Sequence, residues 1–187
     1  MLTKMRSHTD LNINKYHLFV KHMRIICISE KVAFHAVLSS AINGTTPGQT
    51  IIFDQTTTNA GNAYNVTTGQ FTTHVAGHYV FSVTLLIQRS TSFNKRAAFQ
   101  LRQNGNIRIS LYADAHQTDL DFGTASGTAV LYLNSGDIVD VTCRDGNLYI
   151  EGSLFKYSFF SGFLLGKHAC VYVRNDIKIL KMYVLLL

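Results

Sequence analysis

Between residues 32 and 165 the chain alternates short apolar segments with turn residues, and the clearest segment spans residues 77–88. Every second residue in it is apolar or aromatic, and the residues between are mostly polar. Alternation with a period of two over this length predicts a long β-strand with one face in a core. The residues assigned to that face are Tyr79, Phe81, Val83, Leu85 and Ile87.

The dipeptide Asn104-Gly105 separates two further alternating segments, residues 97–103 and 106–112. Asn-Gly is the pair best suited to the positive φ angles of a type I′ turn, so these segments predict a β-hairpin. The alternation places apolar residues on one face of each strand. These are Phe99 and Leu101 before the turn, and Ile107, Ile109 and Leu111 after it.

Three more strands are predicted at residues 121–133, 138–143 and 157–165, with turn residues at 134–137 and 145–146. No helical period separates them, so the series predicts an all-β sandwich or barrel. Several apolar residues fall outside the phase of the assigned core and need either cover or a partner. They are Tyr64, Leu86, Val130 and Tyr132.

The net charge of +6 does not indicate a nucleic-acid-binding protein, because it is concentrated in the two ends. Residues 1–31 carry a formal charge of +4 and residues 166–187 carry +3, whereas residues 32–165 carry −1. A nucleic-acid-binding domain needs its basic residues on the folded body. We therefore expect no nucleic-acid partner, and we divide the chain into a poorly defined flank (1–31), a globular domain (32–165) and a C-terminal extension (166–187).

The three cysteines, Cys27, Cys143 and Cys170, are too few and too widely spaced for a disulfide framework or a zinc site. Cys143 alternates with two valines and is expected to be a small buried apolar residue. The sequence leaves the disulfide state open. Neither end is a membrane span, since the apolar tail 177–187 is shorter than the roughly 20 residues that a spanning helix needs, and residues 1–31 contain no convincing signal peptide.

Residues 53–83 resemble the signature of the C1q domain, which combines aromatic residues, Asn and Gly at fixed spacings. The matching residues are Phe53, Asn59, Tyr64, Phe71, Gly77, Tyr79 and Phe81. Two later segments also resemble the family, one through Gly136-Asp137 and the other, a closing strand, through Gly162. The resemblance implies a ten-stranded jelly-roll sandwich, shared with the tumour necrosis factor family, that assembles as a homotrimer.

The resemblance also implies a class of function. The chain has no collagen-like repeat, so it is similar to the stand-alone C1q-domain proteins, which are extracellular. We predict a non-enzymatic, secreted pattern-recognition module of innate immunity that binds carbohydrate or microbial-surface ligands as a trimer. A signalling ligand for a protein receptor is the alternative, and a purely structural self-assembling module also stays open. Motifs for a nucleophile elbow, a phosphate-binding loop or an HExxH metal site do not occur in the sequence, and we expect no enzyme.

No cofactor is predicted, although some C1q domains bind calcium. The candidate calcium ligands are Asp114, Asp119 and Asp121, whose spacing matches no EF-hand loop; the other interpretation is a solvated loop. Asn43 and Asn65 each begin an Asn-x-Thr triplet and are candidate glycosylation sites in a secreted protein.

Overall fold

The structure is a computed structural model that describes the backbone of residues 23–89, 96–114, 121–153, 155–166, 168–174 and 182–183. Side chains are described for residues 30–88, 96–113, 122–153 and 155–166, again without residue 154. Contacts divide the chain into two compact units. One is residues 31–165, called the domain below, and the other combines residues 1–30 with 166–187.

The domain is all-β in its described residues. Its strands are β2 (Ala33–Val37), β3 (Ile42–Asn43), β4 (Gln55–Ala60), β5 (Tyr64–Asn65), β6 (Gln70–Thr72), β7 (Gly77–Arg89), β8 (Arg96–Gln103), β9 (Asn106–Asp114), β10 (Asp121–Leu133), β11 (Ile138–Cys143), β12 (Tyr149–Ile150) and β13 (Phe159–Leu164). One antiparallel sheet has the order β3-β12-β7-β13-β2-β4, with β10 also paired to β7, and the other has the order β5-β6-β11-β8-β9.

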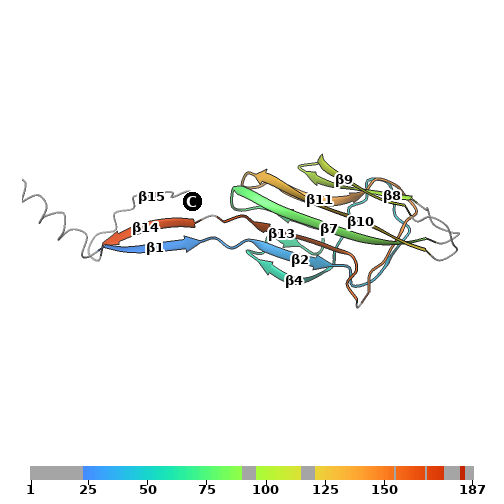
Figure 1. Ribbon diagram of the computed structural model, residues 1–187, viewed down its shortest axis with the longest axis horizontal. Coiled ribbons are helices and arrows are strands. Elements are labelled where there is room, and N and C mark those ends of the chain that lie inside the picture. Colours follow the sequence, from blue (N-terminus) through green and yellow to red (C-terminus); the bar gives the residue numbers. More distant parts are fainter. Residues whose placement is uncertain are drawn as a thin grey trace, which may run out of the picture. The chain divides into compact units, whose positions relative to one another are not determined.

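The two sheets pack face to face as a sandwich (Figure 1). The prediction of an all-β jelly roll is therefore confirmed. The structure assigns twelve strands to the described residues of the domain rather than the ten that the resemblance implies, and three of them, β3, β5 and β12, have only two residues each. The alternation predicted for β7 also holds, because Phe81 and its four in-phase neighbours are all at most 1% exposed.

Aromatic rings fill the space between the sheets around Phe34. Its ring centroid lies 4.9 Å from that of Tyr64, 5.2 Å from that of Phe71 and 4.8 Å from that of Phe160. A buried aromatic side chain removes roughly 150–250 Å² from water, so this cluster supplies a large part of the driving force for folding. Gly162 makes the packing possible, since a Cβ there would lie 2.6 Å from the Phe81 ring and 2.8 Å from the Phe34 ring.

The predicted hairpin is present, with φ angles of 51° at Asn104 and 78° at Gly105. The prediction that Ile107 shares the inner face with Ile109 is wrong. Ile107 pairs with Arg102 and Ile109 pairs with Leu101, so Arg108 is an extra residue in β9. This β-bulge reverses the alternation, and Ile107 is 53% exposed.

The expectation that Tyr64 lies outside the core is also wrong, because its side chain is 3% exposed. The other three residues placed out of phase with the core do differ from it. Val130 is 60% exposed, Tyr132 is 54% exposed, and Leu86 is half-buried.

The second unit contains a three-stranded antiparallel sheet that the alternation of the sequence does not predict. Its strands are β1 (Met23–Ser29), β14 (His168–Arg174) and β15 (Met182–Tyr183), in the order β1-β14-β15. The register of the β1–β14 pair runs from Met23 opposite Arg174 to Ser29 opposite His168. No helix within the described ranges is long and apolar enough to cross a membrane.

Candidate recognition and assembly surfaces

The C1q-like signature residues lie inside the domain and hold its sheets together. The five aromatic ones, Phe53, Tyr64, Phe71, Tyr79 and Phe81, are all at most 3% exposed. Residues with so little exposed area cannot contact a ligand, so the signature describes the architecture of the domain. A binding surface has to be found elsewhere.

Hydrogen bonds explain why three signature positions occur together. The Asn59 side chain donates to the backbone carbonyl of Tyr64 (2.8 Å) and accepts from its N–H (3.2 Å), which fixes the chain between β4 and β5. The Tyr64 hydroxyl in turn accepts from the N–H of Phe53 and donates to its carbonyl, both at 3.2 Å. Burial raises the pKa of Tyr64, so the hydroxyl keeps the proton that it donates.

The Gly136-Asp137 turn is attached to the β8–β9 hairpin by a network of hydrogen bonds. The Asp137 carboxylate accepts from the side chains of Gln103 (2.8 Å) and Asn104 (2.9 Å) and from the N–H of Asn134 (2.9 Å). These bonds, with the Asn104 bond the largest contribution, lower the pKa of Asp137. Every acceptor in the network serves the fold, so this turn is structural.

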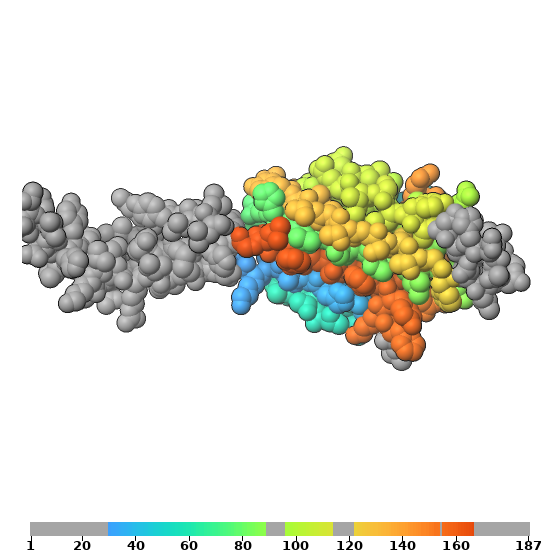
Figure 2. All heavy atoms as spheres, in the orientation of Figure 1, coloured from blue at the N-terminus to red at the C-terminus, as the bar shows by residue number. Residues whose placement is uncertain are grey.

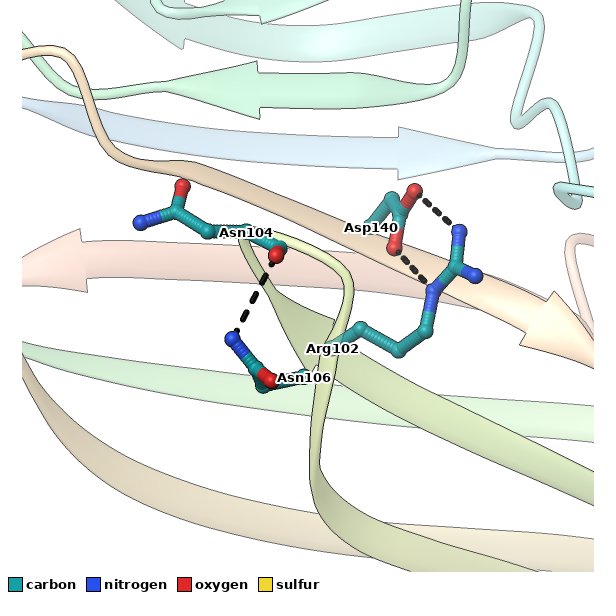
Figure 3. Close-up of polar contacts among 4 residues, drawn as sticks. All are labelled: Arg102, Asn104, Asn106 and Asp140. Atoms are coloured by element: carbon teal, nitrogen blue, oxygen red, sulfur yellow. Dashed lines mark hydrogen bonds and ion pairs between the residues drawn. The ribbon is translucent and has the colours of Figure 1, made fainter.

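An ion pair joins β8 to β11. Arg102 donates to Asp140 through Nε (2.9 Å) and through a terminal guanidinium nitrogen (2.8 Å), as Figure 3 shows, and the two residues are cross-strand partners. The side chain of Asp140 is 7% exposed and that of Arg102 is 25% exposed. The hydrogen bond to Asp140 raises the pKa of Arg102. The pair uses both carboxylate oxygens within the fold, which makes it a structural element.

The exposed face of the β10-β7-β13 layer, opposite to the core, has a different composition. We call it the outward face. Strand pairing arranges its residues in rows across the strands: Tyr132–His78, Val130–Val80–Phe163, Thr128–Ser82–Ser161 and Ser126–Thr84–Phe159. Figure 2 shows β10, β7 and β13 side by side on the surface turned to the viewer, in yellow, green and orange-red.

The outward face is uncharged and partly apolar. None of the residues in its four rows is Asp, Glu, Lys or Arg. At one end Val130 and Tyr132 are exposed together with Phe163 (47%). In the middle, hydroxyl groups pair between strands, Ser82 with Thr128 at 2.9 Å and Thr84 with Ser126 at 3.1 Å. Polar groups that satisfy one another and apolar groups that lie open are typical of a surface that another protein covers.

A second exposed aromatic group lies between β12 and β13. Phe155 is 77% exposed and Tyr157 is 48% exposed, with ring centroids 5.7 Å apart. Lys156 between them has a φ of 56°, and its N–H donates to the carbonyl of Ser153 (3.0 Å), so the segment forms a tight turn. Figure 2 shows the segment around residue 155, in orange, projecting from the body of the domain. We call Phe155, Lys156 and Tyr157 the aromatic tip.

The aromatic tip leaves one signal in the sequence. Two aromatic residues separated by lysine come directly before the closing strand, for which the alternation predicts a start at Tyr157. The strand instead begins at Phe159. Aromatic residues in a connection rather than a strand are therefore the signal for this surface.

The candidate glycosylation residues, Asn43 in β3 and Asn65 in β5, are both exposed. Asn65 accepts a hydrogen bond from the N–H of Thr67 (2.8 Å), so its side chain carbonyl is engaged in the turn that follows. The hydroxyl of Thr45, in the other triplet, accepts from the N–H of Leu148 and lies in a residue that is 5% exposed.

The candidate calcium ligands fall largely outside the described residues. Asp119 is not described, and Asp114 and Asp121 are described only by their backbone, at the end of β9 and the start of β10. Within the residues whose side chains are described, no group of three His, Cys, Asp or Glu residues could hold a metal ion.

Comparison with known sequences finds the C1q domain, whose family model matches residues 33–165. The "Heavy metal-binding protein HIP" of Mytilus edulis is 30% identical over 167 residues, which cover 86% of this chain and 76% of that protein. The mouse "Complement C1q tumor necrosis factor-related protein 3" is 34% identical over 135 residues, which cover 72% of this chain. The chain spans 51% of this mouse protein and 14% of zebrafish "Caprin-2", which is 36% identical over 135 residues.

Solved structures give the same fold. The globular domain of zebrafish complement 1qA protein superposes with a TM-score of 0.55 at 24% identity, covering 78% of this chain and all of that one. The Eiger tumour necrosis factor of S. frugiperda superposes with a TM-score of 0.59 at 15% identity, covering 81% of this chain and 99% of that one. At these identities the likeness establishes the jelly roll alone.

Proposed function

The chain belongs to the C1q domain family, and from this premise we propose that it is a secreted, homotrimeric recognition module for carbohydrate or other microbial-surface ligands. The family consists of non-enzymatic ligand-binding modules. Residues 32–165 are the part that carries this function in the proposal.

The composition of the outward face supports the proposal of self-assembly. Three neighbouring apolar side chains, Val130, Tyr132 and Phe163, are each about half exposed or more, and charged side chains do not interrupt the rows around them. The occupant that fits is the same face of two further copies, because an uncharged face has no complementary charge to select a different partner. A threefold arrangement, which the family resemblance implies, closes on itself and leaves no unpaired copy.

The aromatic tip supports the proposal of carbohydrate binding. The exposed rings of Phe155 and Tyr157 offer apolar surface to the faces of a sugar ring, and Lys156 supplies a donor for its oxygen atoms. Each trimer would present three such tips. Three weak sites on one particle that engage a repetitive surface together raise the overall affinity far above that of a single site.

Extracellular location is the remaining part of the proposal. It rests on the family resemblance and agrees with two exposed asparagines, Asn43 and Asn65, in acceptor triplets. Expression in a secreting eukaryotic cell, followed by removal of N-linked glycans, would test it. A shift in mass that disappears in the Asn65→Gln variant would support secretion through the glycosylation pathway.

A binding screen tests the proposed ligand class. The full chain would be incubated with a glycan array and with fixed bacteria, beside a double variant, Phe155→Ala with Tyr157→Ala. We expect binding by the unmodified chain and a loss of about tenfold or more in the double variant, as when an aromatic anchor is truncated. The control is Tyr112→Ala, since Tyr112 is 57% exposed on β9, in the other sheet.

Two outcomes would contradict this proposal. Equal binding by the double variant would show that the ligand does not bind at the aromatic tip. Absence of glycan and bacterial binding, together with capture of a cell-surface receptor protein, would replace recognition by the alternative of a signalling ligand.

A further inference from the structure

Two of the three cysteines are direct cross-strand partners. In the β1–β14 ladder the register places Cys27 opposite Cys170, although the two are far apart in the sequence. Ile26 lies opposite Val171 and Ile28 opposite Ala169 on either side of them. The sequence alone could not reveal this pairing, because neither cysteine lies in a segment with the turn chemistry of a predicted hairpin.

The separation of the two backbones suits a covalent link. Residues directly opposite each other in an antiparallel pair have Cα atoms about 4.5 or 5.5 Å apart, depending on the hydrogen-bonding pattern. Disulfides join cysteines whose Cα atoms are about 4.4–6.8 Å apart. The Cα separation at both kinds of register position therefore falls within the range found in disulfides.

From this register we infer that Cys27 and Cys170 form an intrachain disulfide that fastens β1 to β14. This inference is independent of the proposed recognition function. It assigns a covalent site to the segments outside the C1q domain. The loop that the bond closes contains the whole region that matches the family, residues 33–165.

The third cysteine does not compete for this bond. Cys143 is 1% exposed in β11, within the core of the domain. Burial raises the pKa of its thiol to about 11, so it is not a thiolate at neutral pH. Because only the thiolate attacks a disulfide, the odd number of cysteines resolves into one pair and one inert buried thiol.

A disulfide would stabilise the β1–β14–β15 sheet, because the sheet is small. β1 and β14 have seven residues each and β15 has two. In the residues that the structure describes, the sheet has few paired positions, and small folded units are usually stabilised by a disulfide or a comparable link. The ladder also joins segments about 140 residues apart, for which a covalent link restricts the unfolded chain strongly.

The reaction needs an oxidant, and a small-molecule disulfide of the glutathione type supplies it. The thiolate of one cysteine attacks that disulfide, forms a mixed disulfide and releases one small thiol. The thiolate of the second cysteine then attacks the mixed disulfide at the protein sulfur and releases the other small thiol. The protein loses two electrons and two protons, and the oxidant gains both as its S–S bond becomes two thiols.

Peptide mapping tests the inference on the full chain. The purified protein would be equilibrated in a buffer of reduced and oxidised glutathione, alkylated without unfolding and digested without reduction. We expect one linked peptide pair containing Cys27 and Cys170, an intact mass lower by two hydrogen atoms, and alkylation of Cys143 only after unfolding. In the Cys27→Ser variant the mass difference should be lost and Cys170 should become alkylated, whereas Cys143→Ala should retain the link.

Two results would overturn the inference. One is alkylation of both Cys27 and Cys170 in the native protein after equilibration with the oxidising buffer. The other is a link from either cysteine to a second chain or to Cys143. Because the assay requires neither a ligand nor a trimer, its failure would leave the proposed function untouched.

Discussion

The two faces of β7 carry different side chains although they belong to the same thirteen residues. The inner face, from Tyr79 to Ile87, is almost fully buried against the other sheet. The outward face carries His78, Val80, Ser82 and Thr84, beside the exposed Val130 and Tyr132 of β10. The signature residues Tyr79 and Phe81 lie on the inner face of β7, whereas the side chains exposed to a partner lie on the outward face.

This difference separates the residues that determine the fold from the residues that are available for association with other chains. Substitutions on the inner face change packing between two sheets of one chain, and their cost appears in the free energy of unfolding. Substitutions on the outward face leave that packing in place, so their cost should appear in association between chains.

The largest effect is expected for Phe81→Ala. The Phe81 ring is fully buried and contacts the rings of Phe71 (5.3 Å between centroids) and Phe160 (6.0 Å). Removing a buried Phe side chain costs about 3–5 kcal/mol, from lost burial and the cavity that remains. Urea unfolding would measure the cost. The control is Val80→Ala, on the opposite face of the same strand, where about 1 kcal/mol or less is expected.

A mild effect of Phe81→Ala would contradict the account, because it would mean that the alternation along β7 assigns the faces in the wrong order. An equally large effect of Val80→Ala, measured at a protein concentration at which the chain is a monomer, would show that the outward face takes part in the core of the same chain. Either outcome would remove the distinction between the two faces.

An intermediate effect is expected at the ion pair between β8 and β11. Arg102→Ala leaves the Asp140 carboxylate without its two donors in a side chain that is 7% exposed. An ionised group that loses such hydrogen bonds costs about 2 kcal/mol. Asp140→Ala should cost less, since the guanidinium of Arg102 is 25% exposed and can reach water. Chemical unfolding of both variants would measure the asymmetry, and a larger cost for Asp140→Ala would contradict it.

The smallest effect concerns the pH dependence of stability. Burial, followed by the nearby charge of Lys156, lowers the pKa of His35 below its ordinary value of 6.5. The unfolded chain therefore binds this proton more readily than the folded one. At pH 8 the titration of His35 does not change the free energy of unfolding. As the pH falls through about 6.5, protonation of the unfolded chain lowers that free energy. His35→Asn should lose less stability between pH 8 and pH 5.5 than the unmodified chain. An identical change in urea midpoint between these two pH values in both proteins would contradict the prediction.

Residues with a regular local pattern could be predicted from the sequence. Phe81 and its in-phase neighbours alternate over a long strand, and Asn104-Gly105 fixes its turn by backbone conformation alone. Ile107 could not be placed, because one extra residue in β9, Arg108, reverses the alternation. Tyr64 lies in a two-residue strand, too short for any period, and hydrogen bonds to Asn59 and Phe53 decide its burial.

The surfaces were harder to predict than the core. Val130 and Tyr132 could be recognised as out of phase, but their neighbours across the sheet depend on the pairing of β10 with β7 and of β7 with β13. The opposition of Cys27 and Cys170 depends on a ladder between the two ends of the chain. Contacts between segments so distant in sequence leave no local pattern.

The most direct test of the account is the oligomeric state of Tyr132→Lys beside Tyr112→Lys. The two tyrosines are exposed to nearly the same extent, 54% and 57%, but Tyr132 lies on the outward face and Tyr112 lies on β9 in the other sheet. Sedimentation equilibrium at tens of micromolar, on the order of the concentration at which a modest interface assembles, should give a trimer for the unmodified chain and for Tyr112→Lys. Tyr132→Lys should sediment as a monomer, because three lysines would be buried close together without partners. A monomeric unmodified chain, or a trimer that Tyr132→Lys leaves intact, would contradict the assignment of the outward face.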